Sequence, residues 1–162
     1  MMRKLLTLLR HPVYIGAVFR RAWSIFKDDR QAELLAIRDI QTEVKKIGTP
    51  PAFLLQMRAY EAELLLRTGE PAQSRALFLE VHKECKDQDD QLAKHLIYYT
   101  HYWLSMLDNK FSQADYWAYR ARQMGLSGKG STRLPSPPVP KDEFDKEFER
   151  IEAEIAKELA QK

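Results

Sequence analysis

Apolar side chains recur at every third or fourth position along most of the chain, which is the spacing of one face of an α-helix. No segment alternates apolar and polar residues for long enough to predict a β-strand. We therefore expect an all-α fold. The helices predicted by the pattern span residues 13–27, 30–47, 52–67, 72–86, 91–107, 112–124 and 142–160.

Residues that start and stop helices separate these segments. Asp28 and Asp29 can cap the helix over 30–47, and Gly48 is a typical stop after it. Asn109 and Gly125 are stops of the same kind. The helices therefore follow one another closely enough to pair as hairpins.

Two of the hairpins resemble each other when Gly69 is aligned with Asn109, 40 residues later. Small or aromatic residues then coincide: Ser74 with Ala114, Phe78 with Ala118, Val81 with Ala121, Ala62 with Tyr102 and Leu65 with Ser105. The residues Ala62, Gly69, Ser74, Phe78 and Val81 make the segment 52–125 resemble a tetratricopeptide repeat, although the family period is about 34 residues. The resemblance implies a short stack of helical hairpins that binds a peptide in a groove. Its candidate groove residues here are Gln56, Glu63, Tyr99, Trp103 and Met106.

The pattern divides the chain into four parts. A basic amphipathic segment spans 1–29, the hairpin domain 30–126, a linker rich in Pro, Gly and Ser 127–140, and a charged amphipathic helix 141–162. The last helix carries one narrow apolar seam, which must dock either on this chain, the groove included, or on a partner. The seam consists of Phe144, Phe148, Ile151, Ile155 and Leu159.

Basic side chains are concentrated at the N-terminal end of the sequence. The formal net charge is +3 over 162 residues, yet the first 27 residues carry six basic side chains and no acidic one. The apolar residues of this segment predict either packing of Phe19, Trp23 and Phe26 on the following helices or contact with an anionic membrane surface. A transmembrane helix is excluded, because charges interrupt every long apolar stretch; a secretory or mitochondrial targeting peptide remains an alternative. The candidate surface residues are Arg3, Lys4, Arg10, Phe19, Arg20, Arg21, Trp23 and Lys27.

No catalytic or metal-binding signature is found in the sequence. The four histidines include no pair at the i, i+4 spacing of a helical metal site, and Gly125–Thr132 lacks the Gly-Lys-Ser/Thr order of a phosphate-binding loop. The single cysteine excludes an intramolecular disulfide scaffold. We therefore expect a protein that is not an enzyme and that uses no metal and no cofactor.

These observations favour an interaction adaptor or scaffold subunit of the cytoplasm, with a protein partner and, as one alternative, peripheral attachment to an anionic membrane. A second hypothesis is a nucleic-acid-associated accessory protein that uses the basic N-terminal arm. It is less favoured, because residues 28–140 carry equal numbers of basic and acidic side chains, and binding would then rest on one short segment.

Overall fold

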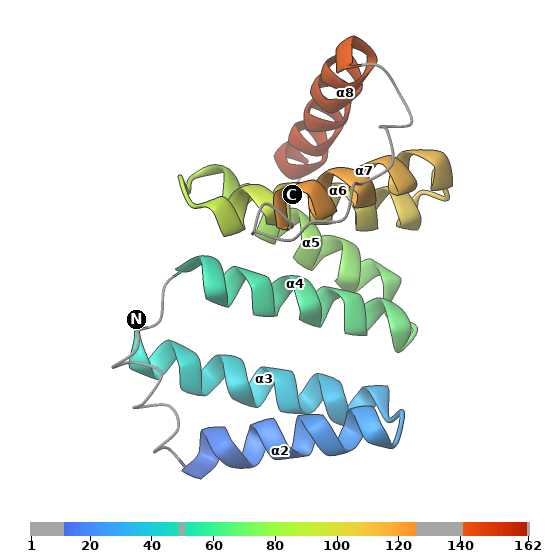
Figure 1. The fold of residues 1–162 in the computed structure, drawn as a ribbon. Helices are drawn as coiled ribbons and strands as arrows, with labels where there is room; N and C mark the ends of the chain where they lie inside the picture. Colours follow the sequence, from blue (N-terminus) through green and yellow to red (C-terminus); the bar gives the residue numbers. More distant parts are fainter. Residues whose placement is uncertain (1–11, 49–50, 126–140, 162) are drawn as a thin grey trace.

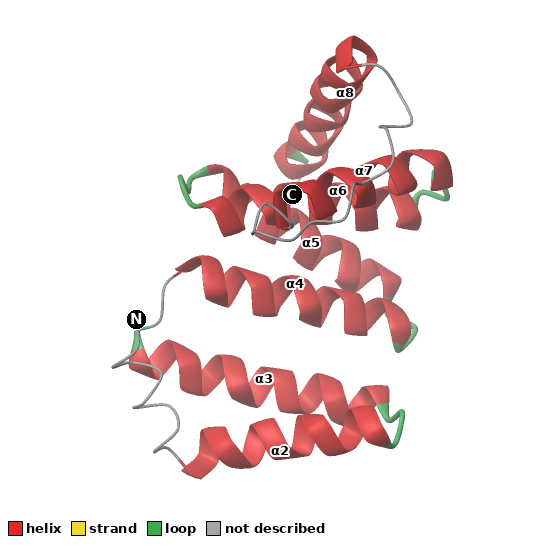
Figure 2. Cartoon of the chain, viewed as in Figure 1, coloured by secondary structure: helices red, strands yellow, loops and turns green. Residues whose placement is uncertain are grey.

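The fold, taken from a computed structural model, is all-α, and the structure describes residues 12–48, 51–125 and 141–161. Within these ranges the chain forms helices and short turns and no strand (Figures 1 and 2). The helices are α2 (Pro12–Phe26), α3 (Arg30–Ile47), α4 (Pro51–Arg67), α5 (Pro71–Lys86), α6 (Gln91–Leu107), α7 (Phe111–Gly125) and α8 (Lys141–Ala160).

The predicted helices are confirmed, with ends that shift by no more than one residue. Pro51 and Pro71 become the first residues of their helices, where the missing N–H of proline has no intrahelical partner to lose. The side chain of Asp29 accepts a hydrogen bond from the backbone N–H of Ala32 (2.9 Å) and so caps α3. Gly48 ends that helix in the left-handed conformation, with φ 66°.

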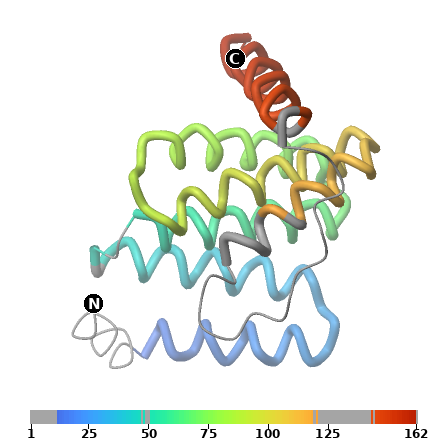
Figure 3. Tube along the Cα trace, turned by 45° about the horizontal axis from the view of Figure 1, so that its top comes forward, coloured from blue at the N-terminus to red at the C-terminus, as the bar shows by residue number. Residues whose placement is uncertain are grey.

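Consecutive helices pack as antiparallel hairpins that stack on one another: α2 with α3, α4 with α5, and α6 with α7 (Figures 1 and 3). The turns within the three hairpins share one hydrogen-bond pattern. Asp28, Gly69 and Asn109 each have positive φ (54°, 89° and 57°), and the next N–H donates to the carbonyl five residues earlier. The acceptors are Ser24, Leu65 and Ser105. The turn of the first hairpin therefore matches the turns of the two hairpins that the sequence aligned.

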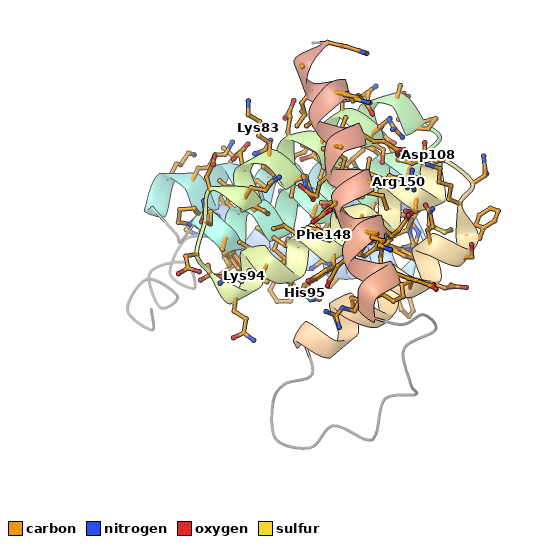
Figure 4. The ribbon with its side chains drawn as sticks, turned by 90° about the horizontal axis from the view of Figure 1, so that it is seen from above. Lys83, Lys94, His95, Asp108, Phe148 and Arg150 are labelled. Atoms are coloured by element: carbon orange, nitrogen blue, oxygen red, sulfur yellow. The ribbon has the colours of Figure 1, made fainter. Side chains whose placement is uncertain are left out.

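The largest hydrophobic core lies between α4, α5, α6, α7 and α8. Phe78 and Trp117 are its largest fully buried apolar side chains. The helix α8 crosses over this part of the stack and supplies Ile151 and Ile155 to the core (Figure 4). Two smaller clusters lie toward the first hairpin. One is centred on Ala17 and joins α2, α3 and α4, and the other is centred on Leu34 and Leu64 and joins α3, α4 and α5.

The aromatic side chains of α2 point away from the following helices, contrary to one of the two expectations for this segment. Ala17 and Ser24 are buried, whereas the exposed fractions of Phe19, Trp23 and Phe26 are 71, 63 and 76%. The packing prediction is therefore wrong for these three aromatic residues. The physical reason is that α2 approaches α3 closely, and the small side chain of Ala17 fits there, against Ile40 and Val44.

Candidate functional site

A groove of about 360 Å³ runs between the first and third hairpins. Four helices line it, and both apolar and polar side chains face it. The lining residues are Arg21 of α2, Ile37 of α3, Phe53, Gln56, Met57 and Tyr60 of α4, and His95, Leu96 and Tyr99 of α6. Such a mixed, concave surface is typical of a binding site.

Two tyrosine–glutamate pairs hold the groove together. The hydroxyl of Tyr60 donates to Glu33 of α3, and the hydroxyl of Tyr99 donates to Glu63 of α4. Glu33 is completely buried and also pairs with Arg30, and Glu63 pairs with Arg67. Burial and the bond to Glu63 raise the pKa of Tyr99 far above its ordinary value, so the phenol stays neutral and keeps donating.

Arg21 presents a hydrogen-bond donor at the rim of the groove. Its guanidinium lies over the ring of Tyr60, 4.7 Å from the centroid. Its Nε is buried and has no hydrogen-bond partner, because the closest carboxylate oxygen, on Glu33, is 3.7 Å away. An acceptor on a bound ligand can complete this bond.

Two of the five predicted groove residues line the groove, and the other three do not. Gln56 and Tyr99 line the groove, and Gln56 is exposed. Glu63 lies beneath Tyr99 as its acceptor. Trp103 stacks on Phe78, with ring centroids 6.0 Å apart, and Met106 is half-buried outside the groove lining.

The outer surface of the first hairpin exposes large apolar side chains between charged residues of both signs. Besides Phe19, Trp23 and Phe26, this surface exposes Leu35 of α3. A shallow hollow of about 610 Å³ lies between the two helices, and Arg20, Lys27, Asp29 and Asp39 are its charged lining residues. Arg20 donates a hydrogen bond to Asp39 (2.6 Å). No helix in the described residues is long and apolar enough to cross a membrane. Of the predicted surface residues, Arg3, Lys4 and Arg10 lie outside the described part of the chain.

The tail helix docks on the hairpins away from the groove. Ile151 and Ile155 are buried, and Phe148 and Leu159 pack against the same core; the side chain of Phe144 and the linker 127–140 lie outside the described residues. None of the groove-lining residues comes from α8, so the prediction that the tail fills the groove is wrong. Phe148 instead lies where α8 crosses the stack, beside Tyr98, His101 and Trp117 (Figure 4).

A polar contact fixes α8 at each end of this docking surface. Arg75 of α5 donates two hydrogen bonds to the carboxylate of Glu158 (2.9 and 2.7 Å) and a third to Asp108 (2.8 Å). Gln113 of α7 donates to Glu147 (2.6 Å). These charged and polar contacts therefore fix the position of α8 along the hairpins.

Beneath α8 lies a cluster of two histidines and a glutamate that the sequence did not indicate. His82 of α5 and His101 of α6 are completely buried, and their rings stack with centroids 5.1 Å apart. Nε2 of His82 and Nε2 of His101 lie 2.9 and 2.8 Å from the same carboxylate oxygen, Oε1 of Glu152. Lys86 contacts the other oxygen, Oε2.

Burial and the neighbouring groups shift the pKa values of this cluster in opposite directions. Burial lowers the pKa of His101 despite its bond to Glu152. Burial raises the pKa of Glu152, but the contacts with His101, His82 and Lys86 outweigh it, and the net pKa lies well below its ordinary value. The cluster therefore offers a carboxylate and two imidazoles to a cation. No local spacing revealed it, because its members come from three helices.

Comparison with known proteins identifies no related family or protein. No protein-family model matches this chain, and no curated protein or solved structure matches it either.

Proposed function

We propose that this protein is a non-enzymatic adaptor with a tetratricopeptide-like body, and that a short segment of a partner protein binds in the groove between α2, α3, α4 and α6. The observation that carries the proposal is the groove itself, lined by apolar and polar side chains, with a buried Nε on Arg21 that makes no hydrogen bond. The partner segment supplies apolar side chains to Phe53, Met57 and Leu96, and a carbonyl or carboxylate oxygen to Arg21.

Three structural features support this function. The Tyr60–Glu33 and Tyr99–Glu63 bonds fix the groove walls before a ligand arrives, which lowers the entropic cost of binding. The tail helix leaves the groove open. The three hairpin turns share one geometry, as expected for a repeat stack that builds a concave surface.

The test uses a variant that fills the groove without disturbing the core. Gln56 is exposed and lines the groove, while Gln73 is an exposed glutamine on α5 outside it. A peptide library displayed on phage is selected against the full-length protein, and selected peptides are titrated against Gln56→Trp and Gln73→Trp. We expect Gln56→Trp to weaken binding at least tenfold and Gln73→Trp to leave it unchanged. Equal binding by both variants contradicts the groove as the site.

A second candidate function is attachment of the first hairpin to an anionic membrane surface. The observation that favours it is the outward aromatic face of α2, with Lys27 and the Asp39-paired Arg20 beside it. Aromatic side chains enter the interface between headgroups and acyl chains, and each basic residue near the surface adds about 1 kcal/mol. Exposure of three large aromatic residues on one helix is otherwise unfavourable for a monomer in water.

Sedimentation with vesicles tests this attachment. The full chain is mixed with phosphatidylcholine vesicles that contain or lack phosphatidylserine. We expect binding to the anionic vesicles alone, and a several-fold loss in Trp23→Ser. Phe111→Ser is the matched control, because Phe111 is an exposed aromatic residue of α7. Equal sedimentation of the two variants, or binding to neither vesicle, contradicts the proposal.

A further inference from the structure

The cluster of His82, His101 and Glu152 brings three metal-ligating side chains from α5, α6 and α8 to one point. Their ligand atoms all lie within 4.8 Å of one another. The two imidazoles are completely buried, and the carboxylate is 14% exposed. Each side chain therefore offers one ligand atom to the same small space.

A threonine fixes which nitrogen of His82 carries the proton. The hydroxyl of Thr100 donates to the carbonyl of Ile97 (2.8 Å), so its oxygen is an acceptor toward Nδ1 of His82, 2.9 Å away. Nδ1 therefore carries the proton. In a neutral imidazole, the other nitrogen, Nε2, then presents a lone pair.

That lone pair is directed into the cluster without a hydrogen bond. Nε2 of His82 is buried and has no hydrogen-bond partner, although Oε1 of Glu152 lies 2.9 Å away. Two acceptors at this distance repel each other unless a cation or a proton lies between them.

We propose that Nε2 of His82, Nε2 of His101 and the carboxylate of Glu152 bind one divalent transition-metal ion, with Zn²⁺ as the ion best matched to them, and that this ion clamps α8 to α5 and α6. Two imidazoles and a carboxylate are a donor set that zinc uses. A tetrahedral zinc ion, with bonds of about 2.0–2.2 Å, places its ligand atoms a little over 3 Å apart. The two imidazole nitrogens lie 2.9 and 2.8 Å from Oε1 of Glu152, so each of these two distances needs to lengthen by only about 0.4 Å to reach that spacing.

The surroundings of the three ligands suit this role. The bond from His82 Nδ1 to Thr100 orients the ring in the way that outer partners orient metal-bound histidines. Lys86 holds Oε2 of Glu152 and leaves Oε1 toward the imidazoles. Glu152 comes from the tail helix, so occupation of the site adds a direct bond between the tail and the body. This inference is independent of the groove and of any partner.

The experiment uses the full chain without an affinity tag. The protein is treated with a chelator, the chelator is removed, and Zn²⁺ is titrated by calorimetry. Co²⁺ replaces Zn²⁺ for absorption spectroscopy, because tetrahedral Co²⁺ gives intense visible bands. We expect one ion per chain, a raised thermal midpoint and slower hydrogen exchange in α8.

Two glutamates of α8 supply the variant and its control. Glu152→Gln keeps the size of the side chain and removes the charge; Glu154→Gln makes the same change two residues later, at an exposed position that pairs with Arg150. We expect Glu152→Gln to fold and to bind Co²⁺ at least tenfold more weakly, and Glu154→Gln to bind as the wild type does. Thr100→Val should weaken binding by about 10–100-fold.

Three results overturn the proposal. One is the absence of a Co²⁺ spectrum and of a thermal shift in the wild-type protein. Another is equal binding by wild type and Glu152→Gln, which places the ion elsewhere. The third is a nitrogen NMR spectrum with protons on both nitrogens of His82 at neutral pH, unchanged by Zn²⁺, which assigns the cluster to a buried imidazolium–carboxylate pair instead.

Discussion

Asp28 and Asn109 occupy equivalent positions in two hairpin turns, 81 residues apart in the sequence, and have nearly the same φ, 54° and 57°. Each is the second residue after the end of its helix. In each case the following N–H donates to a serine carbonyl, of Ser24 or Ser105 (2.8 and 2.9 Å). Gly69 occupies the same position in the hairpin between them. The body is therefore built from one hairpin design used three times.

The shared turn predicts opposite effects for two substitutions. Gly69 has φ 89°, with nothing near the position of an added Cβ, so Gly69→Ala introduces left-handed strain without a clash. We expect this change to lower the free energy of unfolding by about 1 kcal/mol. Asn109→Gly relieves the same strain and should be neutral or slightly stabilising. Urea unfolding of both variants checks the pair, and a loss of stability in Asn109→Gly would argue against a common turn.

Trp117 should be among the most sensitive positions of the core. It is completely buried and contacts the rings of Tyr98, His101 and Phe148. Trp117→Ala leaves a large cavity beneath α8 and should cost about 3–5 kcal/mol. Phe111→Ala, an exposed aromatic change on the same helix, should stay within about 0.5 kcal/mol of wild type. Thermal unfolding of the two variants distinguishes them.

Arg75 should control the docking of the tail helix. Arg75→Lys keeps the charge but loses the two-pronged contact with Glu158. Because both side chains are about one third exposed, solvent weakens the pair, and we expect a loss of about 1 kcal/mol. Hydrogen exchange in α8 should accelerate. Arg150→Lys is the control, since Arg150 pairs with Glu147 and Glu154 of its own helix; equal exchange in both variants would contradict a docking role for Arg75.

Cys85 should be unreactive in the folded protein. Burial and the nearby charge of Glu84 raise the pKa of its thiol to about 12, against the smaller opposing effect of Arg58. The reactive thiolate is therefore scarce near pH 8, and the sulfur is shielded from reagents. We expect alkylation by iodoacetamide to be slow in buffer and fast in denaturant. Rapid alkylation of the native protein would show that α5 is more open than this packing implies.

Tyr99 should make stability fall in alkaline solution. Its pKa in the folded protein is raised above the ordinary value of 10.0, so its contribution to stability is complete below pH 10 and is lost as the pH rises beyond that value. Tyr60 acts in the same direction. Tyr99→Phe removes the bond to Glu63 and should cost about 1–3 kcal/mol at neutral pH, while flattening the decline above pH 10. Unfolding curves at several pH values test this; a decline as steep as that of wild type would contradict it.

Local signals in the sequence were sufficient to predict the helices and most residues of the apolar seam on the tail helix. Asp29, Gly48 and Pro71 act on backbone groups within one turn of themselves, so their effect can be read from neighbouring residues. The spacing of Phe148, Ile151, Ile155 and Leu159 likewise defines one face of a single helix. The partner of that face was not defined in this way, because it depends on how the hairpins stack.

By itself, therefore, the sequence determined the all-α fold, the helix ends and one pair of repeated hairpins, because hydrogen bonds and side-chain spacing within a helix are local. Only the tertiary structure decided that the aromatic face of α2 points outward, because the close approach of α2 to α3 selects the small side chain of Ala17. It also decided the meeting of His82, His101 and Glu152. Those side chains are 19 and 51 residues apart along the chain, and the packing of α5, α6 and α8 alone brings them together.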